Sequence, residues 1–195
     1  GVIDTTVRLG VNYRYTVKAV GESSVSGYKT TGTVKYNVTP VVKATNVTNG
    51  IKVTWTTVAN AFGYTVYSST YNAKTKKWST AKKVATAKSS ATSWTDTKVK
   101  SGVQYRYTVK AVNGKIYSSA KTTSGLMFLT MPKTTVKAVK NGVTVTWTQS
   151  TGATSYEVYR AEYNKKTKKY SGYKKVATAK STAKSYTDKT AKKGV

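Results

Sequence analysis

Aromatic residues flank a lysine-rich turn in two stretches of the chain, residues 71–78 (YNAKTKKW) and residues 163–170 (YNKKTKKY). Aromatic rings stack on sugars and bases, while lysine ammonium groups neutralise carboxylates, phosphates and sulfates. The structural alternative is that the lysine stems lie along the rings, keep a sheet face soluble and discourage aggregation at its edge. On the functional interpretation, the candidate binding residues are Tyr67, Tyr71, Lys74, Lys76, Lys77, Trp78, Arg106, Lys110, Tyr159, Tyr163, Lys166, Lys168, Lys169 and Tyr170.

Side chains that commonly perform catalysis are scarce. The chain has no His and no Cys, so it lacks the usual acid–base group at neutral pH, a thiol nucleophile and the commonest zinc ligands. Three of its six acids, Asp4, Asp96 and Asp188, occupy one position of a repeat, at an expected turn where Asp caps local backbone. We therefore expect no enzymatic activity, no cofactor and no metal site.

The charge of the chain points to polyanionic partners. Lys and Arg together number 34 and Asp and Glu number 6, which gives a formal net charge of +28. Only four of the cations are Arg, the residue whose planar fork recognises phosphates and bases specifically. This scarcity of Arg disfavours nucleic acid as the partner and favours acidic glycans or cell-wall polymers.

A tandem repeat organises the whole sequence. The run YRYTVKAV occurs at Tyr13–Val20 and again at Tyr105–Val112, a spacing of 105 − 13 = 92 residues. Residues 1–103 align on residues 93–195 at this period without a gap. A fixed period over this length indicates copies of one small domain rather than low complexity. Further pairs at the same spacing are Pro40 and Pro132, Trp55 and Trp147, and Asp96 and Asp188.

Alternation of apolar and polar residues predicts β-strands. In Ile51–Thr56 and in Tyr105–Val112, every second residue is apolar and the residues between are polar. This period of two is typical of antiparallel sheets with one buried face. Asn49-Gly50, Asn113-Gly114 and Asn141-Gly142 are hairpin signals between such runs. Six or seven short strands per period predict an all-β fold of tandem β-sandwich modules.

The run VKSGVQYRYTVKAVN, Val99 to Asn113, resembles the corner and following strand of fibronectin type III domains. Val99, Gly102 and Tyr105 match that family's pattern, and the resemblance implies that Tyr105 is the tyrosine-corner residue. Ser101 departs from the pattern, because the family prefers Pro there. The resemblance also matches Trp55 and Trp147 to the tryptophan of the family's second strand, strand B.

Strand parity and the resemblance together predict where the candidate residues point. Tyr67 and Tyr71 should point outward together, and Arg106 and Lys110 should point outward from a neighbouring strand of the same sheet. Tyr159 and Tyr163 repeat the arrangement. We expect Trp78 to be exposed beside them. The resulting surface would carry rings interleaved with cations in each module.

The module boundaries are predicted near Pro40 and Pro132, because Pro interrupts strand pairing. Residues 41–132 then form a complete module, residues 1–40 the last two strands (F and G) of a preceding module, and residues 133–195 the first strands (A to E) of a following one. One interpretation is a fragment of a longer array. The other is assembly in trans, in which residues 1–40 of one chain complete residues 133–195 of the next, head to tail.

The lysine-rich repeat is also similar to repeats in surface proteins of Gram-positive bacteria, which implies an extracellular or cell-surface location. No apolar run reaches the length of a membrane span and nothing resembles a signal peptide. The sequence thus predicts a non-catalytic structural stalk that also binds acidic polymers weakly and multivalently. The alternatives are a basic nucleic-acid-binding protein and a ligand-free spacer of a larger secreted enzyme.

Overall fold

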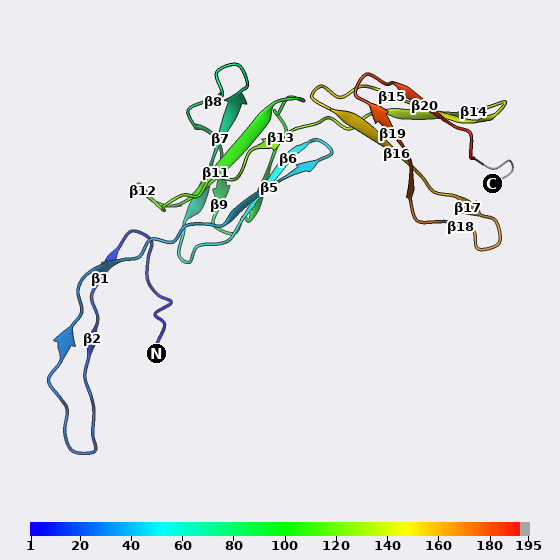
Figure 1. Ribbon diagram of the computed structural model, residues 1–195. Helices are drawn as coiled ribbons and strands as arrows, with labels where there is room; N and C mark the ends of the chain where they lie inside the picture. The colour runs from blue at the N-terminus through cyan, green and yellow to red at the C-terminus, as the bar shows by residue number, and fades with distance from the viewer. Residues whose placement is uncertain (192–195) are drawn as a thin grey trace. The chain divides into compact units, whose positions relative to one another are not determined.

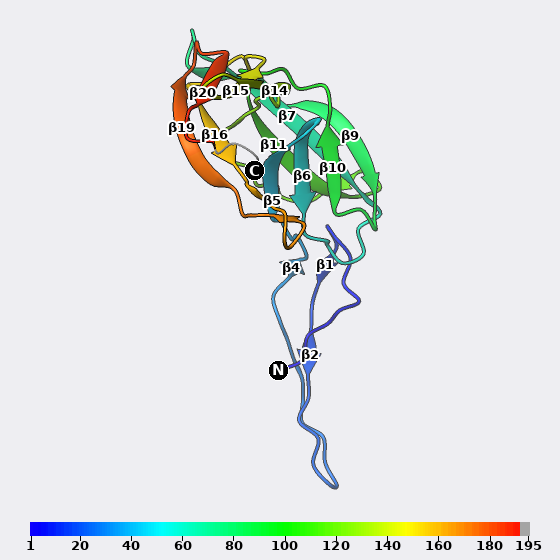
Figure 2. The same ribbon diagram turned by 90° about the vertical axis from the view of Figure 1, so that its right-hand side faces the viewer.

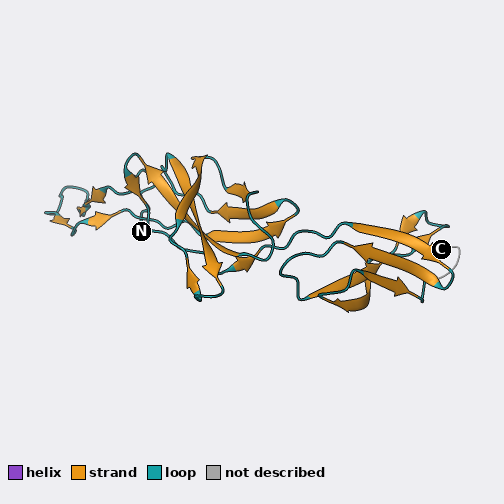
Figure 3. Ribbon diagram, turned by 90° about the horizontal axis from the view of Figure 1, so that it is seen from above, coloured by secondary structure: helices purple, strands orange, loops and turns teal. Residues whose placement is uncertain are grey.

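The computed structural model describes residues 1–191 and contains only strands, turns and loops over that range (Figures 1 and 3). The residues divide into two compact units. Unit 1 comprises Gly1–Thr97 and Gln104–Leu126, and unit 2 comprises Lys98–Val103 and the described part of Met127–Val195. Among the described residues there is no helix long and apolar enough to cross a membrane. The boundaries predicted at Pro40 and Pro132 remain a prediction, since the two units are defined by contact rather than by repeat.

Unit 1 contains a complete β-sandwich. One sheet has the order β10–β6–β5, and the other has the order β12–β11–β7–β9, with β8 paired to the end of β7. Eight short antiparallel strands form these sheets, where the sequence predicted six or seven, and the expected all-β, fibronectin type III-like sandwich is confirmed. The strands are β5 (Val42–Val47), β6 (Gly50–Trp55), β7 (Gly63–Asn72), β8 (Lys77–Trp78), β9 (Lys82–Lys88), β10 (Ser93–Asp96), β11 (Gln104–Asn113) and β12 (Ile116–Tyr117).

The core of unit 1 lies between its two sheets (Figure 2). β6 contributes Ile51, Val53 and Trp55, and the ring of Trp55 lies 5.5 Å from that of Tyr64 on β7. The inward residues of β11 are the alternate ones predicted from the sequence, and each is buried. The buried residues of β7 and β11 are Tyr64, Val66, Tyr105, Tyr107, Val109 and Ala111.

A hydrogen bond joins the two sheets inside this core. The hydroxyl of Tyr107 on β11 donates to Oδ2 of Asp96 at the end of β10, at 2.9 Å, and both residues are buried. Burial, together with the neighbouring Asp96 carboxylate, raises the pKa of Tyr107 well above its usual range, so the hydroxyl keeps its proton and remains a donor. Asp96 is therefore part of the core rather than only a cap of a surface turn.

The hairpin between β5 and β6 forms one residue earlier than the Asn-Gly signal suggested. Val47 pairs with Gly50, so the two loop residues are Thr48 and Asn49. Gly50 instead lies in the strand, where a Cβ atom would collide with the backbone carbonyl of Asp96. The same relation holds for Gly142 and Asp188 in unit 2. Glycine is needed at these two positions for close approach of the backbones.

Residues 12–35, in the first part of unit 1, form a long two-stranded ribbon (Figure 1). β2 (Thr16–Val17) pairs with β3 (Lys29–Thr30), and β1 (Asn12–Tyr13) pairs with β4 (Val34–Lys35). The ribbon's side chains are mostly exposed. Before it, Leu9 is buried and the side-chain amide of Asn60 donates to the carbonyl of Val7 at 2.7 Å, which ties this segment to the sandwich.

Unit 2 repeats the first strands of the sandwich. β14 (Thr134–Val139), β15 (Gly142–Trp147) and β20 (Ser185–Asp188) form one sheet in the order β14–β15–β20. β16 (Ser155–Arg160) pairs with β19 (Lys174–Lys180), and β17 (Tyr163–Asn164) pairs with β18 (Lys169–Tyr170). β13 (Leu126–Met127) lies where the sequence passes from unit 1 to unit 2.

Candidate binding face

Five predicted residues of unit 1 come together on the outward side of β7, β8 and β11. The guanidinium carbon of Arg106 lies 4.6 Å from the ring centre of Trp78, and the Nζ atom of Lys110 lies 5.7 Å from that of Tyr67. The rings of Tyr71 and Trp78 are 5.3 Å apart and tilted by 55°. Both cation–ring distances are within the range of cation–π attraction. We call this set, Tyr67, Tyr71, Trp78, Arg106 and Lys110, the ring–cation face.

Strand register explains why these side chains meet. β11 pairs with β7 so that Thr108 is opposite Tyr67 and Arg106 is opposite Ser69, and Tyr71 pairs with Trp78 across β7 and β8. Alternate residues of a strand share one side, so Tyr67 and Tyr71 lie on the side opposite the core. The prediction from strand parity therefore matches the geometry of the face.

Trp78 is half-buried, rather than exposed as was expected from the sequence. Gly125 lies against it: a Cβ atom at that position would come within 3.0 Å of Cζ2 of the indole. Arg106 lies across the ring, and its buried Nε atom has no hydrogen-bond partner within the described chain. Packing against the indole, rather than a hydrogen bond to Nε, holds the guanidinium in place. The part of the ring that remains exposed is the part a ligand would touch.

The turn between β7 and β8 presents three of the predicted lysines to solvent. Oδ1 of Asn72 accepts hydrogen bonds from the backbone amides of Lys74 at 2.9 Å and Thr75 at 3.1 Å. Lys76 adopts the left-handed conformation, with φ of 52°, that closes the turn. Lys74, Lys76 and Lys77 are exposed. The side-chain cap makes this a defined turn rather than a loose loop.

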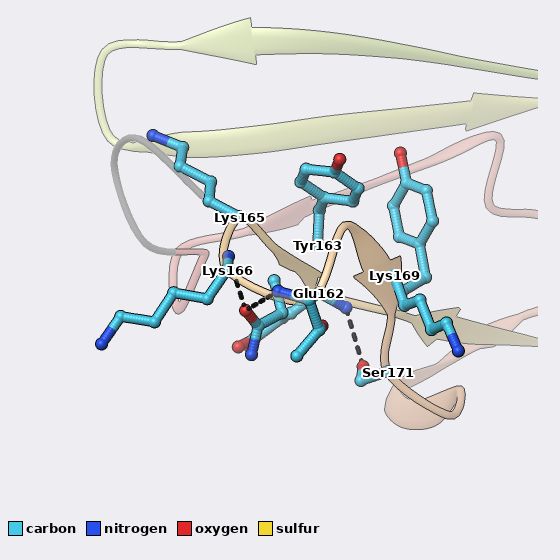
Figure 4. Close-up of a pocket in the computed structure, with 9 residues that line it drawn as sticks. Glu162, Tyr163, Lys165, Lys166, Lys169 and Ser171 are labelled. Atoms are coloured by element: carbon cyan, nitrogen blue, oxygen red, sulfur yellow. Dashed lines mark hydrogen bonds between the residues drawn. The ribbon is translucent and has the colours of Figure 1, made fainter.

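In unit 2, the β17–β18 turn carries the residues that correspond, one period later, to those of the β7–β8 turn (Figure 4). The rings of Tyr163 and Tyr170 are 5.2 Å apart, and Asn164 caps the turn as Asn72 does. The β17–β18 turn borders an open hollow of about 600 Å³. Of the predicted lysines, Lys166 and Lys169 line the hollow and Lys168 does not, while Tyr159 lies outside it on β16. Lys165, which the prediction left out, also lines it.

Acidic partners distinguish the unit 2 residues from those of unit 1. Tyr159 donates through its hydroxyl to Glu157 at 2.7 Å, and Lys175 pairs with the same carboxylate at 2.9 Å. These two contacts lower the pKa of Glu157. Glu162, which borders the hollow, pairs with Arg160 at 2.6 Å. A carboxylate at the edge of the hollow disfavours anions there, so the ring–cation face of unit 1 is the better candidate for an acidic ligand.

Arg160, Glu162 and Asp188 form a cluster that the sequence prediction missed. Arg160 Nη1 lies 2.8 Å from Oδ2 of buried Asp188, and its other amino group contacts Glu162. The sequence does mark Arg160 as a departure from the repeat, because the residue one period earlier is Ser68. Hydrogen bonds from Thr190 and from Arg160 lower the pKa of Asp188, and the Asp188 contact raises the pKa of Arg160.

The lowered pKa of Asp188 predicts how unit 2 responds to acid. A depressed carboxyl pKa contributes stability that is fully present above the pKa of the unfolded chain, about 3.9, and is lost as pH falls through the folded value. We expect unit 2 to lose stability below about pH 4 and the Asp188→Asn variant to lose less over the same interval. Amide hydrogen exchange in β20 as a function of pH measures this. Equal acid sensitivity of the two proteins would contradict it.

Among the described residues, no cluster of three or more acidic side chains could hold a metal ion. The expectations of no cofactor and no catalysis remain predictions.

Comparisons with known proteins add little beyond the fold. No protein-family profile matches the chain, and no curated protein matches it. Among solved structures, the chain is similar to the FN1–FN3 domains of chicken CNTN1, at 16% sequence identity and a TM-score of 0.37. The alignment covers 91% of this chain and 64% of that one, so this chain spans less than two thirds of its length. At this score the likeness carries no argument about function.

Proposed function

We propose that this protein is a non-catalytic repeat module that binds acidic polymers, such as acidic glycans or cell-wall polymers, through the ring–cation face of unit 1. The observation that carries the proposal is the contact of Arg106 with Trp78 at 4.6 Å and of Lys110 with Tyr67 at 5.7 Å on one side of the sheet. A sugar ring stacks on the exposed part of an aromatic ring while the neighbouring cations neutralise its acidic substituents.

The scaffold supports this role because it holds the side chains before a ligand arrives. Tyr67 and Arg106 lie in strands of ten residues each, paired over eight positions. Little side-chain freedom is lost on binding when the groups are already packed together. The lysines of the β7–β8 turn add charge beside the face and extend the contact along a polymer.

Weak binding by one module becomes useful through repetition. The 92-residue period copies the ring and lysine positions along the chain, and a polymer offers many equivalent sites. Linked sites of this kind raise the overall affinity without a new contact. The proposal therefore assigns the protein to an extracellular or cell-surface stalk with an adhesive side, and head-to-tail joining of chains by strand exchange would lengthen the array.

The test is binding of the purified chain to an immobilised sulfated or carboxylated polysaccharide, to cell-wall polymer and to DNA, over a series of salt concentrations. The proposal predicts that one class of glycan is retained at high salt, whereas binding to DNA falls steeply as counterions compete. Uniform loss of all binding with salt would show that the charge acts generically and that the chain is a spacer. Retention of DNA alone would favour the nucleic-acid alternative.

Binding to a sulfated polysaccharide should not depend on pH between about 6 and 9. The chain contains no His, the side chain whose unperturbed pKa lies in this interval, so its net charge of +28 changes little there. Sulfate groups also keep their charge there. Measuring the affinity at constant ionic strength across this interval checks the prediction, and a change of tenfold or more would contradict it.

A further inference from the structure

The dipeptide Asn-Gly occurs three times in the chain, each time at a two-residue hairpin, but not at the same place in the hairpin. Asn49-Gly50 lies between β5 and β6, Asn141-Gly142 between β14 and β15, and Asn113-Gly114 between β11 and β12. Glycine after asparagine leaves the backbone nitrogen open to the asparagine side chain, because no Cβ atom obstructs it. The fold therefore places one reactive dipeptide in different settings.

In two of the hairpins the glycine closes the turn. Gly50 pairs with Val47, and Gly142 takes the same position one period later. The amide of the closing residue donates to the carbonyl three residues earlier, so the nitrogen of each glycine is engaged. Each of these glycines is also the first residue of a strand and packs against a backbone carbonyl, that of Asp96 or that of Asp188.

In the third hairpin the glycine lies inside the loop. Asn113 pairs with Ile116, so the loop residues are Gly114 and Lys115, and the closing amide is that of Ile116. Gly114 is exposed and has φ of 59°, and a Cβ atom built on it would meet no atom within 4 Å. The nitrogen that follows Asn113 is therefore not the donor of the turn, and the loop around it has room to rearrange.

We infer that Asn113 is a site of spontaneous deamidation and that the fold protects Asn49 and Asn141 from the same reaction. The Gly114 nitrogen attacks Cγ of Asn113 and forms a C–N bond. The bond from Cγ to Nδ2 breaks, and ammonia leaves with the proton of the Gly114 amide. Water then opens the five-membered imide at either carbonyl, which gives aspartate or isoaspartate. The inference goes beyond the proposed function and does not depend on it.

The protection of the other two sites has a structural cause. Ring closure at Asn49 requires the hydrogen bond of the turn to break and Gly50 to move away from the carbonyl of Asp96. β6 is the central strand of its sheet, between β5 and β10, and β15 has the same place between β14 and β20. The reaction there can proceed only in the fraction of molecules in which these strands have opened locally.

Deamidation at Asn113 should loosen the hairpin that follows β11. Isoaspartate adds a main-chain atom where β11 turns into β12, just beyond the pair of Val112 with Tyr117. Past this pair, the amide of Ser118 donates to the carbonyl of Ala111 at 2.9 Å. A longer main chain at the turn displaces one strand against the other. We therefore expect the Ser118 amide to exchange faster with solvent as the modification accumulates.

Incubation of the intact chain in mildly alkaline buffer, followed by peptide mass spectrometry at intervals, tests the inference. Trypsin places the three sites on separate peptides, residues 44–52, 111–115 and 141–160. Deamidation replaces the side-chain amino group by a hydroxyl group, which changes the peptide mass. We expect the rate at Asn113 to exceed those at Asn49 and Asn141 by at least about tenfold. A rate at Asn113 no higher than at either other site would overturn the inference.

The same chain unfolded in denaturant is the control for sequence effects. Unfolding frees all three glycine nitrogens, so Asn113 should lose most of its lead over the other two sites. An undiminished lead in the unfolded chain would show that the neighbouring residues, and not the hairpin geometry, set the order of rates.

The variant Asn113→Gln is the control for the effect on the hairpin. Glutamine would need a larger ring to react, so this position should stay unmodified over the same period. Hydrogen exchange at Ser118 should quicken with age in the natural chain and stay constant in the variant. Equal behaviour of the two proteins, with Asn113 shown to be modified, would contradict the loosening of the hairpin.

Discussion

Replacing Trp78 by alanine is expected to weaken binding to an acidic polysaccharide by about five- to 150-fold at high salt, the loss expected for one stacking ring. The indole is the ring in closest contact with a cation, at 4.6 Å from Arg106, and it lies beside Tyr71. Salt screens the lysines but hardly affects stacking, so the effect is largest where the generic attraction has been removed. Calorimetric titration at about 0.5 M salt measures it.

Two controls separate a lost contact from a damaged fold. Phe62→Ala removes a ring that is 73% exposed and lies just before β7, at the opposite end from Tyr71, and it should leave binding unchanged. Trp78→Phe keeps a ring in place and should retain part of the affinity. Because Gly125 packs against Trp78, the thermal stability of the alanine variant must be measured as well. Full affinity in a folded Trp78→Ala protein would show that the ring–cation face does not bind the polysaccharide.

Replacing Asp96 by alanine is expected to destabilise unit 1 by about 1–3 kcal/mol, the cost of leaving a buried hydrogen-bonding group without its partner. The group left behind is the hydroxyl of Tyr107, which donates to Asp96 at 2.9 Å in the core. Hydrogen exchange of the β11 amides reports the loss within unit 1, where the change occurs.

The repeat supplies a matched control for this change. Asp4 lies one period before Asp96, and its carboxylate accepts from Tyr15, the counterpart of Tyr107, at 3.1 Å. That pair is exposed, so Asp4→Ala should leave the stability nearly unchanged. Asp96→Asn, which retains an acceptor oxygen, should lose less than Asp96→Ala. Similar effects at positions 4 and 96 would contradict the role assigned to the buried hydrogen bond.

Much of the sandwich could be predicted from alternation alone. The inward residues of β11, Tyr105, Tyr107, Val109 and Ala111, are the alternate apolar positions of one strand, and all are buried. The outward grouping of Tyr67 with Lys110 follows from the same alternation, because strand parity is a local property. A period of two determines which side a residue takes whatever its neighbours are.

Contacts between strands distant in sequence could not be predicted in the same way. The half-burial of Trp78 depends on Gly125, and the bond between Tyr107 and Asp96 depends on how two sheets face each other. Asp96 was expected at a turn, but it is the last residue of β10, pairs with Ile51 and is buried. The contact of Arg160 with Asp188 could not be predicted from the repeat, because the residue one period before Arg160 is Ser68.

The most direct test of the central claim is a proton–nitrogen NMR titration of the chain with a defined sulfated oligosaccharide at high salt. The four Trp residues give separate indole signals, and Trp55 and Trp147 are buried internal references. The account predicts saturable shifts of the Trp78 indole and of the Arg106 and Lys110 amides, with the two buried indoles unchanged. Shifts spread over lysine-bearing turns with no change at Trp78 would show that charge alone binds the ligand, and would contradict the account.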